Sequence, residues 1–375
     1  MKAIDLFSGC GGVSCGLTQS GFEVVKAVEI DAQAVAAYKN YTPLHNVDVI
    51  HGDIRKVSGE NILENTNIEE GELYLLAGCP PCQKFSMQNR KNNLDESNRE
   101  QKEELLNEFL RIIQELYPPF ILMENVPGIK SLFKGVVLQD FLAKLRNDGT
   151  EILENKYHVK YDVVNAADYG VPQRRRRFVL HAVRMDIYEN LIERGIEWNL
   201  PAVTHSQCVK DSLKPWVTVD DAIMDLPAIV AGQRYQDESV NNHYCSGLSD
   251  TNLERIRIIR KNGGSRDSLP ERLVLKCHKS YTGHKDVYGI MKHDEPAPTI
   301  TGGCTCYSKG RFGHPYQDRA ISVREAARLQ TFPDDFIFGE SITKASLEIG
   351  NAVPVKLVKA SGDEILKVMT QLMNE

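Results

Sequence analysis

The chain has 375 residues, of which 42% are hydrophobic and 26% charged, and its formal net charge is −6. This length allows one large domain and a smaller one, and the negative charge means that any nucleic-acid binding must depend on a local basic patch. The sequence begins with a strand-like run and has no apolar segment near the ~20 residues of a membrane helix, so we expect neither a secretory signal nor a membrane span. Nine cysteines without regular spacing favour reduced thiols in the cytosol over a disulfide framework.

Short β-prone runs alternate with helical segments over the first 200 residues. Strands are expected at 2–7, 22–29, 46–50, 73–77, 120–123, 161–165 and 178–183, and helices at 12–19, 32–38 and 101–116. In the last of these helices the apolar residues recur with helical period, and Pro118 and Pro119 end it. The alternation predicts an α/β fold with a doubly wound, mostly parallel, Rossmann-like sheet.

Residues with chemically useful properties come at the ends of the expected strands or directly after them. They are Gly9, Glu29, Asp53, Cys82 and Glu124. In open parallel sheets, ligands bind at the carboxyl ends of the strands. The sequence therefore predicts a functional site at this edge of the sheet.

The composition changes after about residue 200, where periodicity weakens and Gly, Pro, Asn and Ser become frequent. We expect a first domain at 1–200, a smaller irregular domain at 201–340, and a C-terminal segment at 341–375 that returns to the first domain. Within the second domain, residues 255–285 hold nine Lys or Arg and two acidic residues, a local charge of +7. Such a stretch suits contacts to phosphates.

The segment Ser8-Gly9-Cys10-Gly11-Gly12 follows the first strand and opens a helix. Glycines at such a turn let the backbone approach a ligand, and an acid at the end of the next strand, here Glu29, is typical of ribose binding. Position 14 is serine and no Gly-Lys-Ser/Thr is present, so the segment is neither a dinucleotide fingerprint nor a phosphate loop. With Asp53 as a second acid, the pattern favours a nucleoside without phosphates, such as S-adenosylmethionine, over a turn needed only for packing.

The segment AGCPPCQKFS at 77–86 places two prolines between two cysteines. A redox pair usually lies at a helix start in a thioredoxin-sized domain, which is not indicated here. A zinc site would need a second ligand pair, and the candidate pair, Cys304 and Cys306, has poor spacing. We favour a third interpretation, in which the prolines fix the chain so that the Cys82 thiol points at a substrate and Cys79 is a packed neighbour.

Together, these segments resemble the cytosine-C5 DNA methyltransferase family of the bacterial restriction-modification type. AGCPPCQKFS is similar to its nucleophile motif, and DLFSGCGG to its cofactor motif. Further matches, in the family's order, are Glu29, Gly52-Asp53, ENVPG at 124–128, QRRRR at 173–177, REAARLQTFPDDF at 324–336 and GNAVP at 350–354. The resemblance covers nearly the whole chain and implies methyl transfer from S-adenosylmethionine to carbon 5 of a cytosine in a specific double-stranded DNA sequence.

The resemblance implies a covalent mechanism centred on Cys82. Its thiolate would add to carbon 6 of cytosine and make carbon 5 nucleophilic, while a Glu124 carboxyl group protonated at that moment would donate to or bridge N3 as charge develops there. Arg177 would contact the cytosine carbonyl and help to hold Glu124, with Arg175 assisting. The predicted catalytic set is completed by two neighbours in the same motifs, Asn125, which would orient its loop, and Gln83.

Contacts to the cofactor are implied for a larger set of residues. Glu29 would bind the ribose hydroxyls, Asp53 the adenine amino group, and Ile30 and Ile54 the faces of the adenine ring. Asn351 in the last motif would reach back to the cofactor. The methionine and ribose side would be lined by Phe7, Gly9, Cys10 and Gly11. The implied product is S-adenosylhomocysteine, and no metal is implied.

A cytosine inside a stacked duplex is inaccessible, so the family's reaction implies that the base flips out. The polar segment 88–101 is predicted to close over it, with an ordinary surface loop as the alternative. Residues 201–340 are predicted to be the target-recognition domain. DNA contacts are expected from four basic residues, for each of which a solvated surface position is the alternative: Arg174, Arg176, Arg266 and Lys279.

Two other functions stay open from the sequence. Transfer-RNA cytosine methyltransferases share these motifs but usually carry a Cys-Phe-Thr signature, which this chain lacks. A catalytically inactive DNA-binding regulator is disfavoured by the intact motif residues. The resemblance further implies a bacterial, cytoplasmic, nucleoid-associated monomer, accompanied by a restriction endonuclease that acts separately.

Overall fold

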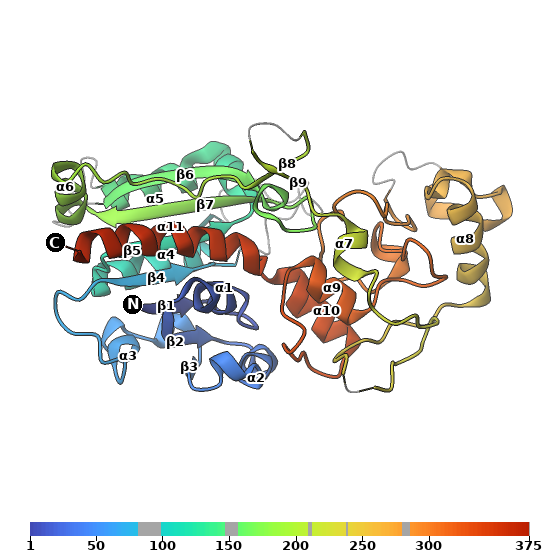
Figure 1. Ribbon diagram of the computed structural model, residues 1–375, viewed down its shortest axis with the longest axis horizontal. Coiled ribbons are helices and arrows are strands. Elements are labelled where there is room, and N and C mark those ends of the chain that lie inside the picture. The colour runs from blue at the N-terminus through green and yellow to red at the C-terminus, as the bar shows by residue number, and fades with distance from the viewer. Residues whose placement is uncertain (82–98, 147–156, 209–211, 238, 280–285, 375) are drawn as a thin grey trace. The chain divides into compact units, whose positions relative to one another are not determined.

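The computed structural model describes residues 1–81, 99–146, 157–208, 212–237, 239–279 and 286–374. The chain divides into two units, whose elements Figure 1 labels. The first comprises residues 1–165, 176–202 and 357–375, and the second residues 166–175 and 203–356. The chain thus enters the second unit twice, and the expected C-terminal segment 341–375 is divided at residue 357. The roles expected for 1–200, 201–340 and 341–375 stay predictions.

A seven-stranded sheet forms the centre of the first unit. Its strands are β1 (Lys2–Leu6), β2 (Glu23–Glu29), β3 (Asp48–His51), β4 (Tyr74–Gly78), β5 (Phe120–Asn125), β6 (Tyr157–Asn165) and β7 (Arg176–Arg184), in the order β3-β2-β1-β4-β5-β7-β6. Strands β1 to β5 are parallel, and β7 is antiparallel to both β5 and β6. This confirms the predicted mostly parallel sheet. The order reverses between β1 and β4, which is where such sheets bind ligands.

Helices cover both faces of this sheet. They are α1 (Gly12–Ser20), α2 (Ala32–Asn40), α3 (Gly59–Leu63), α4 (Arg99–Leu116), α5 (Val136–Arg146), α6 (Met185–Glu193) and α11 (Val355–Met373). Helices α1 and α11 lie on one face, where Ser20 Oγ donates to the Lys359 carbonyl at 3.0 Å, and α4 and α5 lie on the other (Figure 1). None of the described helices combines the length and apolar character needed to cross a membrane.

The end of β4 is shaped by packing against α4. Phe109 of α4 is fully buried and stacks on Phe141 of α5, with ring centroids 6.5 Å apart. A Cβ atom on Gly78 would lie 2.3 Å from Cε2 of Phe109. Glycine is therefore required at the last position of β4, and the Cys-Pro-Pro segment follows directly at the carboxyl end of this strand.

The second unit has little regular structure in its described residues. It contains helices α7 (Val219–Ile223), α8 (Asp250–Lys261), α9 (Val323–Leu329) and α10 (Ile342–Asn351), and strands β8 (His205–Ser206) and β9 (Lys214–Pro215). A small apolar core forms where α8 meets the segments that follow it, through Ile256, Ile259, Tyr288, Ile290 and Tyr307. This irregular unit agrees with the weak periodicity of the same part of the sequence.

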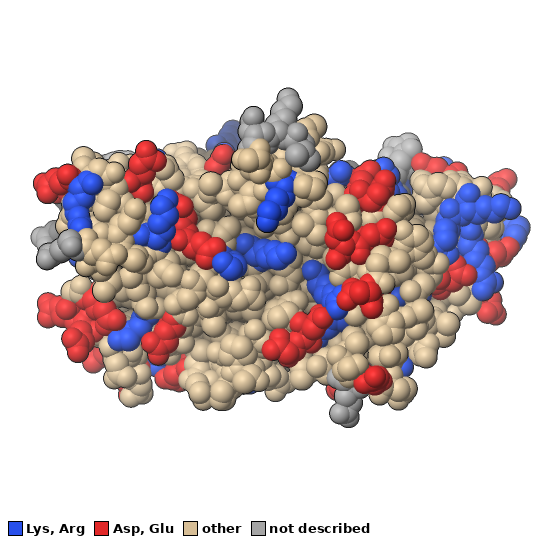
Figure 2. Space-filling view, viewed as in Figure 1, with Lys and Arg blue, Asp and Glu red and all other residues tan. Residues whose placement is uncertain are grey.

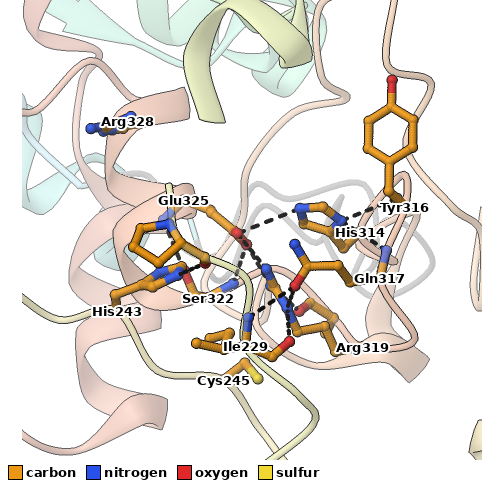
Figure 3. A network of polar contacts seen from close by, with 12 residues as sticks. Ile229, His243, Cys245, His314, Tyr316, Gln317, Arg319, Ser322, Glu325 and Arg328 are labelled. Carbon is orange, nitrogen blue, oxygen red and sulfur yellow. Dashed lines mark hydrogen bonds and ion pairs between the residues drawn. The ribbon is translucent and has the colours of Figure 1, made fainter. Parts of the chain in front are cut away.

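A buried ion pair fixes the start of α9 in the second unit (Figure 3). Arg319 and Glu325 are at most 1% exposed, and their two hydrogen bonds measure 2.7 and 2.6 Å. Glu325 also accepts a hydrogen bond from the Ser322 backbone at 2.7 Å, which completes a capping box. Although burial opposes its ionisation, the hydrogen-bonded Arg319 guanidinium holds the pKa of Glu325 below its ordinary value.

The imidazole of His314 completes this network (Figure 3). Its Nδ1 accepts hydrogen bonds from the backbone of Tyr316 and Gln317, each at 3.1 Å, so its proton lies on Nε2, 3.5 Å from Glu325 Oε1. Burial lowers the pKa of His314 to about 4, which keeps the ring neutral at physiological pH. The REAARL segment therefore begins at a rigid, fully buried polar cluster.

Candidate active site

An ion pair between a glutamate and an arginine lies at the carboxyl end of β5. Strand β7 runs antiparallel beside it, with Glu124 opposite Val179, so Arg177 lies just beyond Glu124 on the neighbouring strand. Arg177 Nε is 2.8 Å from Glu124 Oε1, and both side chains are 13% exposed. A charged pair held in this way is largely shielded from water but still accessible to a substrate.

Asn125 connects this strand end to the Cys-Pro-Pro segment. Its side chain is 3% exposed, and its Nδ2 donates to the Pro80 carbonyl at 3.2 Å. Its Oδ1 accepts a hydrogen bond from the Val126 backbone at 2.8 Å. On the other side, the Cys79 backbone donates to the Leu6 carbonyl of β1 at 3.3 Å. The Cys-Pro-Pro segment is therefore attached to both neighbouring strand ends, and the role of Asn125 in orienting its loop stays a prediction.

Of the two cysteines around these prolines, the structure describes Cys79. Burial raises the pKa of Cys79 well above its ordinary value, and the charges of Glu124 and Asp5 add to this. A thiol that attacks as the thiolate needs a lowered pKa instead. Cys79 is therefore poorly suited to be a nucleophile. The predicted catalytic residues Cys82 and Gln83 lie outside the described residues, as does most of the segment 88–101.

The turn between β1 and α1 passes through left-handed backbone conformations. The φ angle is +58° at Phe7, +55° at Gly9 and +98° at Gly11, and for a bulky residue such as Phe7 this conformation is strained. A Cβ atom on Gly11 would lie 2.8 Å from Cδ2 of Tyr38, whereas one on Gly9 would meet nothing within 4 Å. Gly11 is thus required by packing, and Gly9 borders open space.

Glu29 ties this turn to the end of β2. Its Oε2 accepts a hydrogen bond from the Gly9 backbone at 2.8 Å, and its Oε1 accepts from the backbones of Ile30 at 2.9 Å and Asp31 at 2.8 Å. These donors fix the carboxylate and leave acceptor capacity for a ligand hydroxyl. Beside it, Ile30 is 62% exposed and presents an apolar surface to solvent.

Asp53 follows β3 and caps the short helix Ile54–Lys56. Its carboxylate accepts from the Arg55 backbone at 3.1 Å, and Arg55 Nε lies 2.9 Å from both carboxylate oxygens. The hydrogen bonds from Arg55 hold the pKa of Asp53 below its ordinary value. An adenine amino group would therefore share this carboxylate with Arg55. Ile54 is 4% exposed, so only a small part of it can contact a ligand.

These residues fit a nucleoside cofactor of the S-adenosylmethionine type. Gly9 borders open space, and the carboxylate of Glu29 is fixed next to it. Within the turn, Ser8 is 5% exposed, and its Oγ has no hydrogen-bond partner among the described residues, as expected of a group that a ligand or water would satisfy. Cys10 is buried in the same turn at 3% exposure. The predicted cofactor-binding set did not include Ser8, although Ser8 lies between two of its members, Phe7 and Gly9, and this position was a signal.

Arg175 is placed differently from Arg177. It is 2% exposed and lies in the second unit, where it donates to the carbonyls of Ile300 at 2.6 Å and of Gly350 and Ala352 at 3.0 Å each. Strand β7 begins at Arg176, so Arg175 precedes the strand that carries Arg177. These contacts support a structural role for Arg175. They do not support the predicted role in which Arg175 assists catalysis.

Two glutamines that the predicted catalytic set did not include fix the same region. Gln173 is fully buried, accepts from the Ile300 backbone at 2.8 Å and donates to Gln330 Oε1 at 2.9 Å. Gln330 in turn donates to the Ile349 carbonyl at 2.6 Å. The segment around Asn351 is therefore held firmly within the second unit, and the Asn351 side chain itself is exposed.

The four predicted DNA contacts differ in their surroundings. Arg176 is exposed, and Arg174 pairs with Glu295 at 2.9 Å while its guanidinium lies 5.5 Å from the ring centroid of Trp216. Lys279 is exposed and pairs with Glu271 at 2.7 Å. Arg266 is 8% exposed, so a phosphate contact from it would require its segment to rearrange.

The basic stretch 255–285 is partly neutralised by acids outside it. Arg257 and Arg260 both pair with Asp318, and Arg272 pairs with Glu254. Figure 2 shows basic side chains with acidic ones among them over α8. The local charge of +7 therefore overstates the positive charge of this surface, because it includes only the residues 255–285 and not the acids that pair with them in the folded chain.

The sheet, its switch point and the groups at its carboxyl edge define an α/β enzyme of the S-adenosylmethionine-dependent methyltransferase class. The model of the family described as C-5 cytosine-specific DNA methylase matches residues 1–367. The chain belongs to this family, which confirms the resemblance, and it is a C-5 cytosine DNA methyltransferase.

Curated relatives of known type extend over nearly the whole chain. The Type II methylase M.HgiDII of Herpetosiphon aurantiacus is 37% identical, with 98% of this chain and 96% of the relative covered. The Type II methyltransferase M1.HphI of Haemophilus parahaemolyticus is 34% identical, with 98% and 87% covered. These similarities place the chain among bacterial restriction-modification methylases.

Solved structures of similar fold also cover nearly the whole chain. A protein described as a DNA modification methyltransferase encoded within a prophage of E. coli superimposes with a TM-score of 0.66 at 25% identity, covering 99% of both chains. The DNMT2 of Spodoptera frugiperda superimposes with a TM-score of 0.59 at 18% identity, covering 98% of this chain and 99% of the other. At that identity the second similarity concerns the fold alone.

Proposed function

We propose that the protein methylates one cytosine within a specific double-stranded DNA sequence, with Cys82 as the nucleophile and Glu124 and Arg177 as its partners. The observation that supports this most is the Glu124–Arg177 pair, at 2.8 Å, on the strand end to which Asn125 attaches the Cys-Pro-Pro segment. The family shares this chemistry, and each group has a separate task in it.

The Cys82 thiolate forms a bond to carbon 6 of the flipped base, and the electron pair of the 5,6 double bond becomes available at carbon 5. S-adenosylmethionine, when bound, would supply the methyl group of its sulfonium to carbon 5 and leave as S-adenosylhomocysteine. Loss of the carbon-5 proton then expels the thiolate and restores the ring. Because the addition builds negative charge toward N3, Glu124 serves there in its protonated form, by donating a hydrogen bond to N3. Arg177 serves by holding Glu124 and contacting the cytosine carbonyl.

The cofactor is proposed to bind at the turn after β1 and along the ends of β2 and β3. Glu29 would bind the ribose hydroxyls, Ile30 and Ile54 would contact the adenine ring, and Asp53 would accept from its amino group. Phe7, Gly9, Cys10 and Gly11 would line the methionine side. Asn351 is proposed as a further contact. The fixed carboxylate of Glu29 and the exposed side chain of Ile30 support this assignment.

The partner is proposed to be duplex DNA, read by the second unit. Arg174, Arg176 and Lys279 are the preferred phosphate contacts, because they are exposed, and Arg266 would join them only after a local rearrangement. We further propose that the enzyme acts as a monomer on chromosomal DNA in the bacterial cytoplasm, beside a separately acting endonuclease.

Labelled S-adenosylmethionine, incubated with the protein and either duplex DNA or transfer RNA, tests the substrate class. We expect label in DNA only, and sequencing for 5-methylcytosine should then give one recognition sequence. Label in RNA only, or in neither substrate, would contradict the proposal in favour of an RNA enzyme or an inactive regulator. The variant Cys82→Ser should bind S-adenosylhomocysteine normally but neither transfer methyl groups nor become trapped on 5-fluorocytosine duplexes.

A further inference from the structure

A buried chain of hydrogen bonds joins three elements of the first unit behind the glycine turn. Asp5 of β1, Ser14 of α1 and Tyr38 of α2 are each fully buried. The Tyr38 hydroxyl donates to Ser14 Oγ at 2.7 Å, and Ser14 Oγ donates to Asp5 Oδ2 at 2.6 Å. Burial raises the pKa of Tyr38 well above its ordinary value, so its hydroxyl keeps its proton and the chain runs in one direction, toward Asp5.

Asp5 also supplies the cap that α1 lacks. The N-cap residue of α1 is Gly11, which has no side chain to accept a hydrogen bond from the first turn. Instead, Asp5 Oδ2 accepts one from the Ser14 backbone at 3.1 Å. The first N–H groups of a helix have no partner inside the helix, and the positive end of its dipole favours an anion there. The carboxyl group of β1 therefore fixes the start of the helix that follows the turn.

Tyr38 holds the same stretch of chain at a second point. Its ring packs so closely on Gly11 that a Cβ there would lie 2.8 Å from Cδ2. Its hydroxyl binds Ser14, three residues further on. The stretch held by these two contacts begins two residues after Gly9, the position that borders open space. The geometry of the turn therefore depends on the Asp5–Ser14–Tyr38 chain.

The surroundings of Asp5 let it change its charge near neutral pH. Its Oδ1 is buried without a hydrogen-bond partner among the described residues. The titratable groups that face it are Glu29 on β2, Cys79 after β4 and Tyr38 on α2. Burial raises the pKa of Asp5 to about 7, against the two hydrogen bonds from Ser14, and the charge of Glu29 raises it further. The carboxylate holds Ser14 more strongly than the neutral acid does, because hydrogen bonds to a charged acceptor are stronger.

We propose that Asp5, acting through Ser14 and Tyr38, is a positioning residue for the cofactor turn, and that its carboxylate form gives the turn its higher affinity for the cofactor. The inference rests on the proposed function, because it takes the turn to be the S-adenosylmethionine site. Asp5 itself needs no contact with the ligand in this role. It acts by holding α1, and hence the backbone that follows Gly9.

The test is calorimetric binding of S-adenosylhomocysteine to the full chain between pH 5.5 and 8.5, with thermal unfolding of each variant recorded alongside. For the unmodified protein we expect binding to tighten with rising pH around 7, by up to about tenfold, which is the limit for a one-unit change in the pKa of Asp5 on binding. In Asp5→Asn, which keeps the shape but not the titration, this step should disappear. Tyr38→Phe, which keeps the ring on Gly11 but removes the hydroxyl, should bind about tenfold more weakly.

Tyr157→Phe is the matched control for the second variant. Tyr157 is as deeply buried in the same unit, and its hydroxyl donates to the Pro118 carbonyl at 2.9 Å, away from the turn. It should lose similar thermal stability without any change in affinity. An Asp5→Asn protein whose pH profile parallels the unmodified one would overturn the inference, as would equal affinities of Tyr38→Phe and Tyr157→Phe. If Asp5→Asn does not fold, the comparison of Tyr38→Phe with Tyr157→Phe still tests the inference. No binding by the unmodified protein would instead overturn the cofactor site, and this inference with it.

Discussion

Glu124 and Arg177 form an ion pair, 2.8 Å between Oε1 and Nε, although 52 positions separate them in the chain. The antiparallel pairing of β5 with β7 brings them together, and this pairing interrupts an otherwise parallel sheet. An antiparallel neighbour lets a side chain from the start of one strand meet one from the end of the other. The geometry thus gives the acid a fixed partner at the carboxyl edge of the sheet, where folds of this kind bind their ligands.

The first prediction concerns this pair. Glu124→Gln should leave the binding of S-adenosylhomocysteine unchanged but reduce the rate of methyl transfer by about 10²- to 10⁴-fold, because the amide cannot share a proton with N3. Single-turnover transfer to duplex DNA measures the effect. The control is Glu108→Gln on α4, which removes the same charge from an ion pair with Arg111 at 2.8 Å and should leave the rate unaltered. Equal rates in the two variants would refute the role of Glu124.

A second prediction separates the two arginines of the motif. Arg175→Met removes a buried guanidinium from three carbonyls, and unpaired buried acceptors cost about 1–3 kcal/mol each, so the free energy of unfolding should fall by at least a few kcal/mol. Arg176→Met, at the neighbouring exposed position, should change stability little. Chemical denaturation followed by circular dichroism measures both. A large loss of transfer rate in Arg175→Met at unchanged stability would restore a catalytic role for Arg175.

The alternation of strands and helices, the mostly parallel sheet and the acids at the strand ends could be predicted from the sequence, because period, glycine turns and strand ends are local signals. The position of Arg175 could not be, since it depends on where β7 begins and on carbonyls of Ile300 and Ala352 far away in the chain. The charge of the basic stretch was overestimated for the same reason, because Asp318 pairs with it only in the folded unit. Likewise, no sequence pattern indicates that Tyr38 binds Ser14. Long-range polar contacts were thus the part that local reasoning missed.

A third prediction concerns the buried pair of the second unit. Glu325→Gln leaves the Arg319 guanidinium buried without its counter-charge, and breaking such a pair costs about 3–5 kcal/mol. Hydrogen exchange of the amides of α9, measured by mass spectrometry on the full chain, should accelerate accordingly. Glu254→Gln, which breaks the exposed pair with Arg272, is the comparison and should leave exchange nearly unchanged. Unaltered protection of α9 in Glu325→Gln would show that the ion pair does not stabilise this helix.

The last prediction follows from the raised pKa of Asp5, about 7 against an ordinary value of 3.8. Between these two values the folded protein holds a proton on Asp5 that the unfolded chain has lost, so this residue's contribution to the free energy of unfolding falls as pH rises. A difference of about three pKa units corresponds to a contribution of roughly 4 kcal/mol to the free energy of unfolding. This contribution is fully lost above pH 7. The difference in stability between the unmodified protein and Asp5→Asn should therefore change by an amount of this order from pH 4 to pH 8, in favour of the variant at high pH. Urea denaturation at a series of pH values measures this difference, and a constant difference across the range would show that Asp5 is ionised throughout and that its burial carries no such cost.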